Sequence, residues 1–359
     1  MAPKIGSAQI RLLEKLCNTC AISGQEGPIR KIVLDELKDY ADHTQVDSMG
    51  NVLITRIGTS ENRLRVMVAA HMDEVGFMIV KDDGDGLYRF DKVGGLDDRQ
   101  LAGKRIVAGS KDTPGVIGAP PIHLTTAAQR KNTMGIDSLC IDLGPKTSTK
   151  LKPGDGATFV PNFTVLGKGN SRKISAKALD DRVGVATLIE LVKNAPENID
   201  LLAAFTVQEE VGLRGARVAG YAFNPDLAIA LDCTPAYDLP HHDPDEENSR
   251  YNTQQGLGPA IYMTDGATLN DPRLVRHLAH TGETNKIPYQ FRQPGGGGTD
   301  AGAIHKVRAG VPSVSVSVPG RYLHTAAGMI ALTDWKNSVK LVYTALSTLP
   351  SDFLASERA

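Results

Sequence analysis

The chain has 359 residues, which is long enough for one large domain and a smaller one. Its 40 lysines and arginines against 41 aspartates and glutamates exclude an electrostatic binder of nucleic acid or membrane surfaces, because such proteins need a basic excess. The N-terminus lacks the apolar region of a signal peptide, no apolar run approaches the roughly 20 residues of a spanning helix, and four cysteines do not make a disulfide scaffold. We therefore expect a soluble, cytoplasmic α/β protein.

Two helices and two strands are predicted near the N-terminus. Apolar residues recur at three- and four-residue spacing from Ile10 to Cys17, which predicts a helix. A second helix is predicted to begin near Pro28, since proline suits a first helical position. Two runs rich in β-branched and apolar residues then predict strands, VLITRIG from residue 52 and LRVMVAA from residue 64.

The pattern of apolar and turn-forming residues changes between about residues 75 and 169. Short apolar runs are separated there by Gly, Asp and Pro, and no long helical stripe is present. This pattern predicts a small β-rich unit inserted into the chain.

Helices and strands alternate again in the C-terminal half. One apolar face over residues 180–194 predicts a helix, and a last helix is predicted over 333–349. Between them the runs LLAAFTV, DLAIALD and VPSVSVSV predict strands of one partly parallel sheet.

Charged and imidazole groups stand where these predicted strands end. In open α/β sheets ligands bind beyond the carboxyl ends of the strands, so these groups are expected to converge in one crevice. The groups are His71, Glu210, Asp232 and His324, joined by Asp180 just before the long helix.

A set of histidines and carboxylates without paired cysteines favours a catalytic metal site that holds zinc, cobalt or manganese. Three carboxylates give a charge of −3, which two divalent ions and one bridging hydroxide would bring to zero. Two ions roughly 3.5–4 Å apart can polarise a carbonyl and activate that bridging water. We therefore expect two divalent ions per subunit.

Further residues are candidates for roles around the metals. Glu209 is the candidate general base, and we expect desolvation to raise its pKa toward neutrality. Asp73 is placed to accept the second imidazole N–H of His71. The glycine run would let the backbone approach a substrate or form a flexible wall. The candidate substrate-binding residues there are Gly297, Gly298, Thr299 and Asp300.

Each of these features also has a simpler interpretation. A histidine at a strand end is usually structural, adjacent acids are usually solvated, and acids often begin helices. The glycine run matches no nucleotide-binding motif, and the C-x-x-C of Cys17 and Cys20 has no second pair. The acidic stretch 241–250 is interpreted as a solvated loop, with cation binding as the alternative.

Taken together, the motifs HMDEVGFMI, KALDDRVG, VQEEVGLRGA, LDCTPA, GGGTDAGAIH and SVPGRYLHT resemble the glutamyl aminopeptidase and TET-type family of dinuclear metalloaminopeptidases. The resemblance implies a phosphorylase/hydrolase-like mixed-sheet catalytic domain over 1–74 and 170–359, with a β-rich dimerisation domain inserted at 75–169. It implies that His71 and Asp232 bind one ion, that Glu210 and His324 bind the other, and that Asp180 bridges both. It also implies a cis peptide bond between Asp180 and Asp181.

The function expected from this resemblance is removal of N-terminal residues from short peptides, with the subunits building dimers and then a dodecamer. Two alternatives stay open. One is a metal-independent, endoglucanase-like glycoside hydrolase, which needs two carboxylates roughly 5–9.5 Å apart and leaves both histidines without a role. The other is a non-catalytic assembly protein. The segments that follow Asp232 and precede Ser23 look unusual for the family, so side-chain preference is not assigned.

Overall fold

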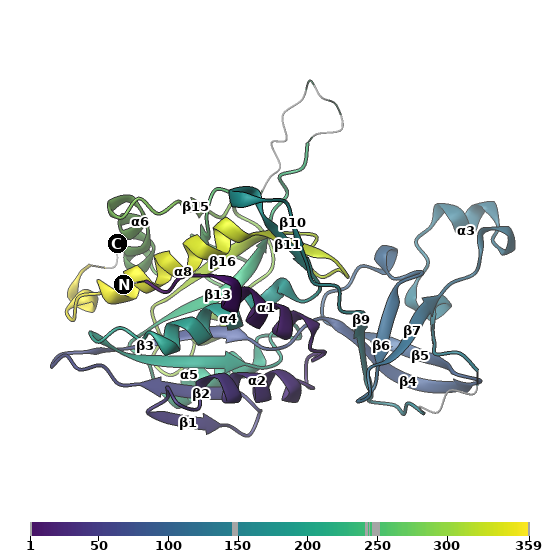
Figure 1. Ribbon diagram of the computed structural model, residues 1–359, viewed down its shortest axis with the longest axis horizontal. Coiled ribbons are helices and arrows are strands. Elements are labelled where there is room, and N and C mark those ends of the chain that lie inside the picture. The colour runs from purple at the N-terminus through teal and green to yellow at the C-terminus, as the bar shows by residue number, and fades with distance from the viewer. Residues whose placement is uncertain (1, 146–149, 241–242, 244, 246–251, 358–359) are drawn as a thin grey trace.

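The computed structural model describes residues 2–145, 150–240, 243, 245 and 252–357. A large mixed sheet carries helices on both faces, and a smaller closed β-barrel lies beside it (Figure 1). This confirms the predicted fold class, an α/β fold with a mixed sheet and a smaller β-rich domain. Most of the stretch 241–250 lies outside the described residues. No described helix has the length and apolar composition needed to cross a bilayer.

Four neighbouring strands of the large sheet run parallel, as predicted: β12 (Ile199–Thr206), β3 (Leu64–His71), β13 (Leu227–Pro235) and β16 (Ser313–Arg321). Their carboxyl ends therefore share one edge of the sheet. In spatial order the strands are β1 (His43–Val46), β2 (Val52–Arg56), β12 (Ile199–Thr206), β3 (Leu64–His71), β13 (Leu227–Pro235), β16 (Ser313–Arg321), β17 (Gly328–Ala331), β11 (Lys173–Ala176) and β10 (Thr164–Leu166). Two short strands, β14 (Ala260–Ile261) and β15 (Gln290–Phe291), extend the sheet from β16.

Helices bury both faces of the sheet because successive side chains of a buried strand point in opposite directions. On β3, Val66 and Val68 face the larger core, whereas Met67 and Ala69 face a smaller one. The larger core includes α1 (Ser7–Asn18), α2 (Gly27–Leu37), α4 (Leu179–Lys193), α6 (Pro272–Thr284) and α8 (Leu332–Ser347). The smaller core includes α5 (Arg214–Phe223) and α7 (Ala301–Ile304).

The barrel has a hydrophobic core of its own. In this core the ring of Phe77 packs edge to face against Phe90 and Phe159, with distances between ring centroids of 5.2 and 5.4 Å. Its strands are β4 (Gly76–Gly84), β5 (Leu87–Val93), β6 (Arg105–Ala108), β7 (Thr113–Gly118), β8 (Cys140–Asp142) and β9 (Gly156–Phe159), with the short helix α3 (Ala127–Lys131). Short 3-10 turns lie at Asp98–Gln100, Ile122–Leu124, Ile136–Ser138, Gly169–Ser171 and Phe353–Ala355. The division at residues 75 and 169 stays a prediction.

A buried cluster of charged residues joins the barrel to the sheet. Both carboxylate oxygens of Glu74 lie 2.8 Å from Lys177 Nζ, and Arg182 Nη2 lies 3.5 Å from Oε1. All three side chains are at most 2% exposed. Thr158 of β9 donates a hydrogen bond to Glu74 at 3.0 Å, and the Ala21 backbone N–H donates another. Pairing and hydrogen bonding of this kind offset the cost of removing charges from water.

We expect Lys177→Met to lower the free energy of unfolding by about 3–5 kcal/mol, because it leaves the buried Glu74 carboxylate without its closest cation. Denaturant unfolding of the metal-free protein measures the change. Lys31→Met is the matched control, since Lys31 pairs with Asp35 on an exposed helix face and such pairs contribute little. Equal losses in the two variants would contradict the role given to the buried cluster.

Candidate active site

The predicted site residues converge at the carboxyl edge of the parallel strands. His71 is the last residue of β3, and Asp232 lies near the end of β13. Glu209 and Glu210 follow β12, and His324 follows β16. Asp180 lies at the start of α4, which packs beneath the same edge. Segments far apart in sequence therefore surround one point, as the strand-end pattern predicted.

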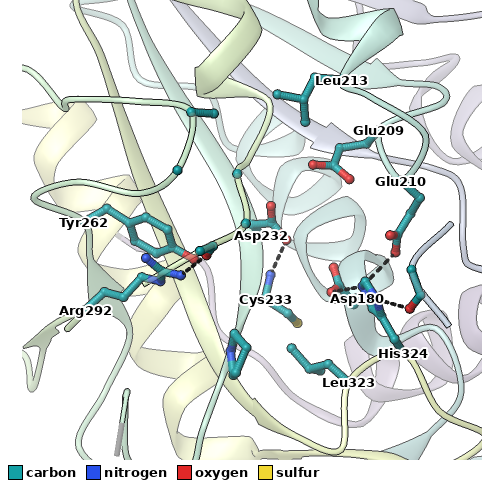
Figure 2. A pocket seen from close by; sticks show the side chains of 17 residues that line it. Asp180, Glu209, Glu210, Leu213, Asp232, Cys233, Tyr262, Arg292, Leu323 and His324 are labelled. Carbon is teal, nitrogen blue, oxygen red and sulfur yellow. Dashed lines mark hydrogen bonds and ion pairs between the residues drawn. The ribbon is translucent and has the colours of Figure 1, made fainter. Parts of the chain in front are cut away.

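Asp180 lies between the two imidazoles. Its Oδ1 is 3.2 Å from His71 Nε2, and its Oδ2 is 3.4 Å from His324 Nε2. Glu210 Oε1 lies 3.2 Å from His324 Nε2, and Asp232 Oδ1 lies 3.9 Å from His71 Nε2. Figure 2 shows the side chains of Asp180, Glu210 and His324 meeting on one side of a pocket. This grouping pairs each imidazole with its own carboxylate around a shared aspartate.

The peptide bond between Asp180 and Asp181 is cis, as the resemblance implied. Asp181 is fully buried, and its Oδ1 accepts a hydrogen bond from the Gly184 backbone N–H at 3.0 Å. A Cβ on Gly184 would overlap both oxygens of the Asp181 carboxylate. Glycine at 184 therefore makes room for the second aspartate of the pair.

The electrostatics of the cluster favour cations. Among the described residues, no lysine or arginine forms an ion pair with its three carboxylates. Burial raises the pKa of Asp232 well above its usual range and raises that of Glu210. Burial opposes protonation of His324, but hydrogen bonds with Asp180 and Glu210 raise its pKa to about 11. Imidazole and carboxylate are ligands that zinc, cobalt and manganese accept, so this donor set fits divalent ions.

Asp73 organises the turn that carries the two glutamates. Its carboxylate accepts hydrogen bonds from the backbone N–H groups of Glu209 and Glu210 at 3.1 and 3.2 Å. Ser23 Oγ donates a third hydrogen bond at 2.6 Å, and His71 Nδ1 lies 3.5 Å from Asp73 Oδ1. A contact of this carboxylate with the imidazole was predicted from sequence, but the nearer oxygen to His71 Nδ1 is the backbone carbonyl of Asp73, at 3.2 Å. The part played by Ser23 was not predicted, because no local signal pairs it with a residue fifty positions away.

Glu209 lines a pocket of about 700 Å³ together with four residues of the cluster, Asp180, Glu210, Asp232 and His324. Figure 2 shows its carboxylate on the same side as Glu210, and shows Tyr262 and Arg292 together on the opposite side. Burial raises the pKa of Glu209 well above its usual range. The pocket is in the size range of small-ligand sites.

The glycine run forms one wall of this pocket, but only two of the four predicted substrate-binding residues line it. Gly297 and Gly298 line it. Thr299 and Asp300 are buried beneath the wall, where Thr299 Oγ1 lies 2.7 Å from Ser315 Oγ and Asp300 accepts a hydrogen bond from Thr206 Oγ1. The structure therefore does not bring these two side chains into the pocket.

Arg292 holds the wall in place, a role that the sequence did not reveal. Its guanidinium donates hydrogen bonds to the Gly296 carbonyl at 2.7 Å and to Thr234 Oγ1 at 3.2 Å. It also lies over the ring of Tyr262, 4.7 Å from the ring centroid. The glycine segment is therefore tied to β13 and to the segment that follows β14.

The C-x-x-C cysteines are not among the residues that line the pocket. Cys17 belongs to α1 and is buried in the larger core, and burial raises the pKa of Cys17 and of Cys20 to about 12. Both therefore carry thiols, which are weak metal ligands and weak nucleophiles at neutral pH.

Comparison with known proteins agrees with this geometry. A family model described as M42 glutamyl aminopeptidase matches residues 50–341. The lysyl aminopeptidase of Pyrococcus furiosus is 32% identical over 95% of this chain and 98% of its own length. The glutamyl aminopeptidase of Lactococcus lactis subsp. cremoris is 31% identical over 91% of this chain and 94% of its own.

A solved structure extends the similarity to the fold. The Pyrococcus horikoshii TET1 peptidase, described as assembling into a tetrahedron or a large octahedral shell, is 34% identical over 95% of this chain and all of its own, with a TM-score of 0.82. Similarity in sequence and in fold thus spans both the sheet and the barrel. The chain belongs to the M42 glutamyl aminopeptidase family.

Proposed function

We propose that this protein is a metal-dependent aminopeptidase that removes N-terminal residues from short peptides. The observation that carries the proposal is the cluster of two imidazoles and three carboxylates without a partner lysine or arginine among the described residues, beside Glu209 in a pocket of about 700 Å³. Membership of a peptidase family supports it.

His71 and Asp232 are proposed to hold one divalent ion, and Glu210 and His324 a second, with Asp180 shared between them. The distances from Asp180 to both imidazoles support this division. Such ions supply Lewis acidity toward a carbonyl oxygen and lower the pKa of water. Zinc and cobalt are the proposed metals, with manganese as the alternative. The donor set suits all three, and which metal is bound in the cell depends largely on availability.

Glu209 is proposed as the general base. Its carboxylate takes a proton from the attacking water and then gives a proton to the nitrogen of the leaving amine. Asp73 holds the backbone of Glu209 through a hydrogen bond, which supports a defined position for the base. The Gly297–Gly298 wall, tied down by Arg292, is proposed to bound the substrate.

The subunits are proposed to form homo-oligomers, a dimer that builds to a dodecamer, with the barrel as dimerisation domain. The description of the P. horikoshii relative as a tetrahedral or octahedral assembly supports the formation of homo-oligomers. The preferred N-terminal residue is not assigned, because relatives of this chain carry names with opposite side-chain charges, lysyl and glutamyl. The cytoplasmic location stays a prediction.

Dialysed protein is expected to hydrolyse at least one member of an aminoacyl-p-nitroanilide panel once zinc, cobalt or manganese is added. A chelator should abolish that activity, and the same metal should restore it. Activity that persists in chelator together with cleavage of cellulose would favour the glycosidase alternative. Metal-bound protein that cleaves no substrate of the panel would favour the assembly protein.

Glu209→Gln should lower kcat by about 10²–10⁴-fold, because the amide cannot accept the proton from water. Metal content, measured by elemental analysis after dialysis, should remain that of the wild type. Glu61→Gln makes the same chemical change on an exposed loop and should leave kcat unaltered. A fully active Glu209→Gln variant would exclude Glu209 as the base.

Asp73→Asn should weaken metal binding by roughly 10–100-fold. The Asp73 carboxylate accepts hydrogen bonds from Ser23 Oγ and from the backbone N–H groups of Glu209 and Glu210, so the amide NH₂ of asparagine would face another donor. Titration of metal-free protein with zinc in a competing chelator measures the affinity. Ser23→Ala, which removes one donor without adding another, should have the smaller effect, and the reverse order would refute this explanation.

A further inference from the structure

A loop of the barrel reaches into the candidate active site. Gly94 and Gly95 follow strand β5, and the Gly95 carbonyl oxygen lies 2.8 Å from Nδ1 of His324. The two residues are 229 positions apart in the sequence. The barrel therefore supplies a polar group to a site whose other members all come from the large sheet and its helices.

This contact determines where His324 carries its proton. A carbonyl oxygen can only accept a hydrogen bond, so Nδ1 must be the protonated nitrogen. In the neutral ring Nε2 then carries the lone pair, and Nε2 is the atom that faces Glu210 at 3.2 Å and Asp180 at 3.4 Å. The barrel carbonyl thus selects the tautomer in which Nε2 can ligate a metal.

His324 depends on an outside contact more than His71 does. His71 is buried, and its Nδ1 lies within 3.5 Å of Asp73 on the same chain segment. His324 follows the end of β16, is 35% exposed at its side chain and has a left-handed backbone with φ of 56°. A non-glycine residue keeps that conformation only where its surroundings determine it.

The close approach leaves little room for a side chain at either loop position. A Cβ on Gly95 would lie 3.3 Å from His324 Nδ1 and 3.6 Å from Cε1. At Gly94, where φ is +84°, a Cβ would lie 2.8 Å from Val75 Cγ1 and 3.3 Å from Glu210 Cβ. A side chain at either position would therefore press the loop away from a proposed metal ligand.

The loop itself is fixed to the barrel. Lys92 Nζ donates a hydrogen bond to the Leu96 carbonyl at 3.1 Å and pairs with Asp98 at 2.7 Å. Leu96 and Leu101 are buried in the barrel core. The position of the Gly95 carbonyl is consequently determined by the barrel and not by the sheet.

A second link ties the His324 loop to the segment that leaves the barrel. Asn162 donates a hydrogen bond to the Ala326 carbonyl at 2.9 Å and accepts one from the Lys177 backbone N–H at 3.2 Å. The segment that leaves the barrel and the Gly95 loop thus both contact the loop that carries His324.

We infer that Gly95 is a positioning residue whose carbonyl orients His324 toward one of the two proposed metal ions, so that the inserted barrel completes the active site within its own subunit. The inference rests on the proposed function, because it assumes that the cluster binds metal. It predicts that displacing the loop weakens one metal site and spares the other.

Gly95→Ala tests this inference, with Gly135→Ala as the matched control. Gly135 lies in the same inserted segment, and a Cβ there meets no atom within 4 Å. Metal bound per chain is measured by equilibrium dialysis at a series of buffered zinc concentrations, together with the visible spectrum of the cobalt form and the thermal midpoint of the metal-free protein.

Wild type and Gly135→Ala are expected to bind two ions, whereas Gly95→Ala should bind one normally and the other roughly 10–100-fold more weakly, at an unchanged metal-free midpoint. Its cobalt spectrum should differ from that of the wild type. Wild-type affinity for both ions in folded Gly95→Ala would overturn the inference and leave the proposed function intact. A wild type that binds no metal would overturn both.

A second measurement needs no loop variant and applies even where Gly95→Ala does not fold. The zinc-loaded wild type is labelled with ¹⁵N in its 9 histidines, and His324 is identified by the signal missing from His324→Gln. Long-range ¹H–¹⁵N spectra should show a neutral ring protonated at Nδ1. A proton on Nε2 would overturn the inference.

Discussion

A carboxylate that is almost completely buried, Glu74, constrains the arrangement of the whole molecule. An unpaired charge at that depth would be strongly destabilising, so Lys177, Arg182 and Thr158 must all reach it. Glu74 lies three residues after His71, and Lys177 lies three residues before Asp180. Satisfying one buried charge therefore brings the end of β3, the start of α4 and strand β9 of the barrel together, and the site lies where they meet.

The same meeting point explains why the site can concentrate negative charge. The parallel strands end there, so Glu210 and Asp232 come close to Asp180 at the start of α4 and to the two histidines. The backbone N–H groups of the glutamate turn stabilise one further carboxylate, that of Asp73, by donating hydrogen bonds to it. The Gly95 carbonyl adds a contact from outside the sheet. The barrel is thus part of the environment of the site as well as a separate hydrophobic core.

Sequence reasoning located the cluster because its signal was local. Composition and apolar runs predict the buried strand that ends at His71 and the one that is followed by Glu210. The carboxyl ends of parallel strands lie at the same edge of a sheet, so these residues were expected to lie close together. The same reasoning placed Thr299 and Asp300 beside the substrate, whereas both side chains point inward to Ser315 and Thr206. A run of glycines indicates a close backbone approach but does not tell which way the next side chains turn.

The sequence by itself determined the α/β class, the β-rich insertion and the residue types that gather at the strand ends, because periodicity and composition are properties of neighbouring residues. Only the tertiary structure decided that Ser23 supports Asp73, that Arg292 holds the glycine wall, and that Gly95 meets His324. Those contacts join positions dozens to hundreds of residues apart. Their geometry follows from how the barrel, the sheet and the helices pack, and no local pattern along the chain encodes that packing.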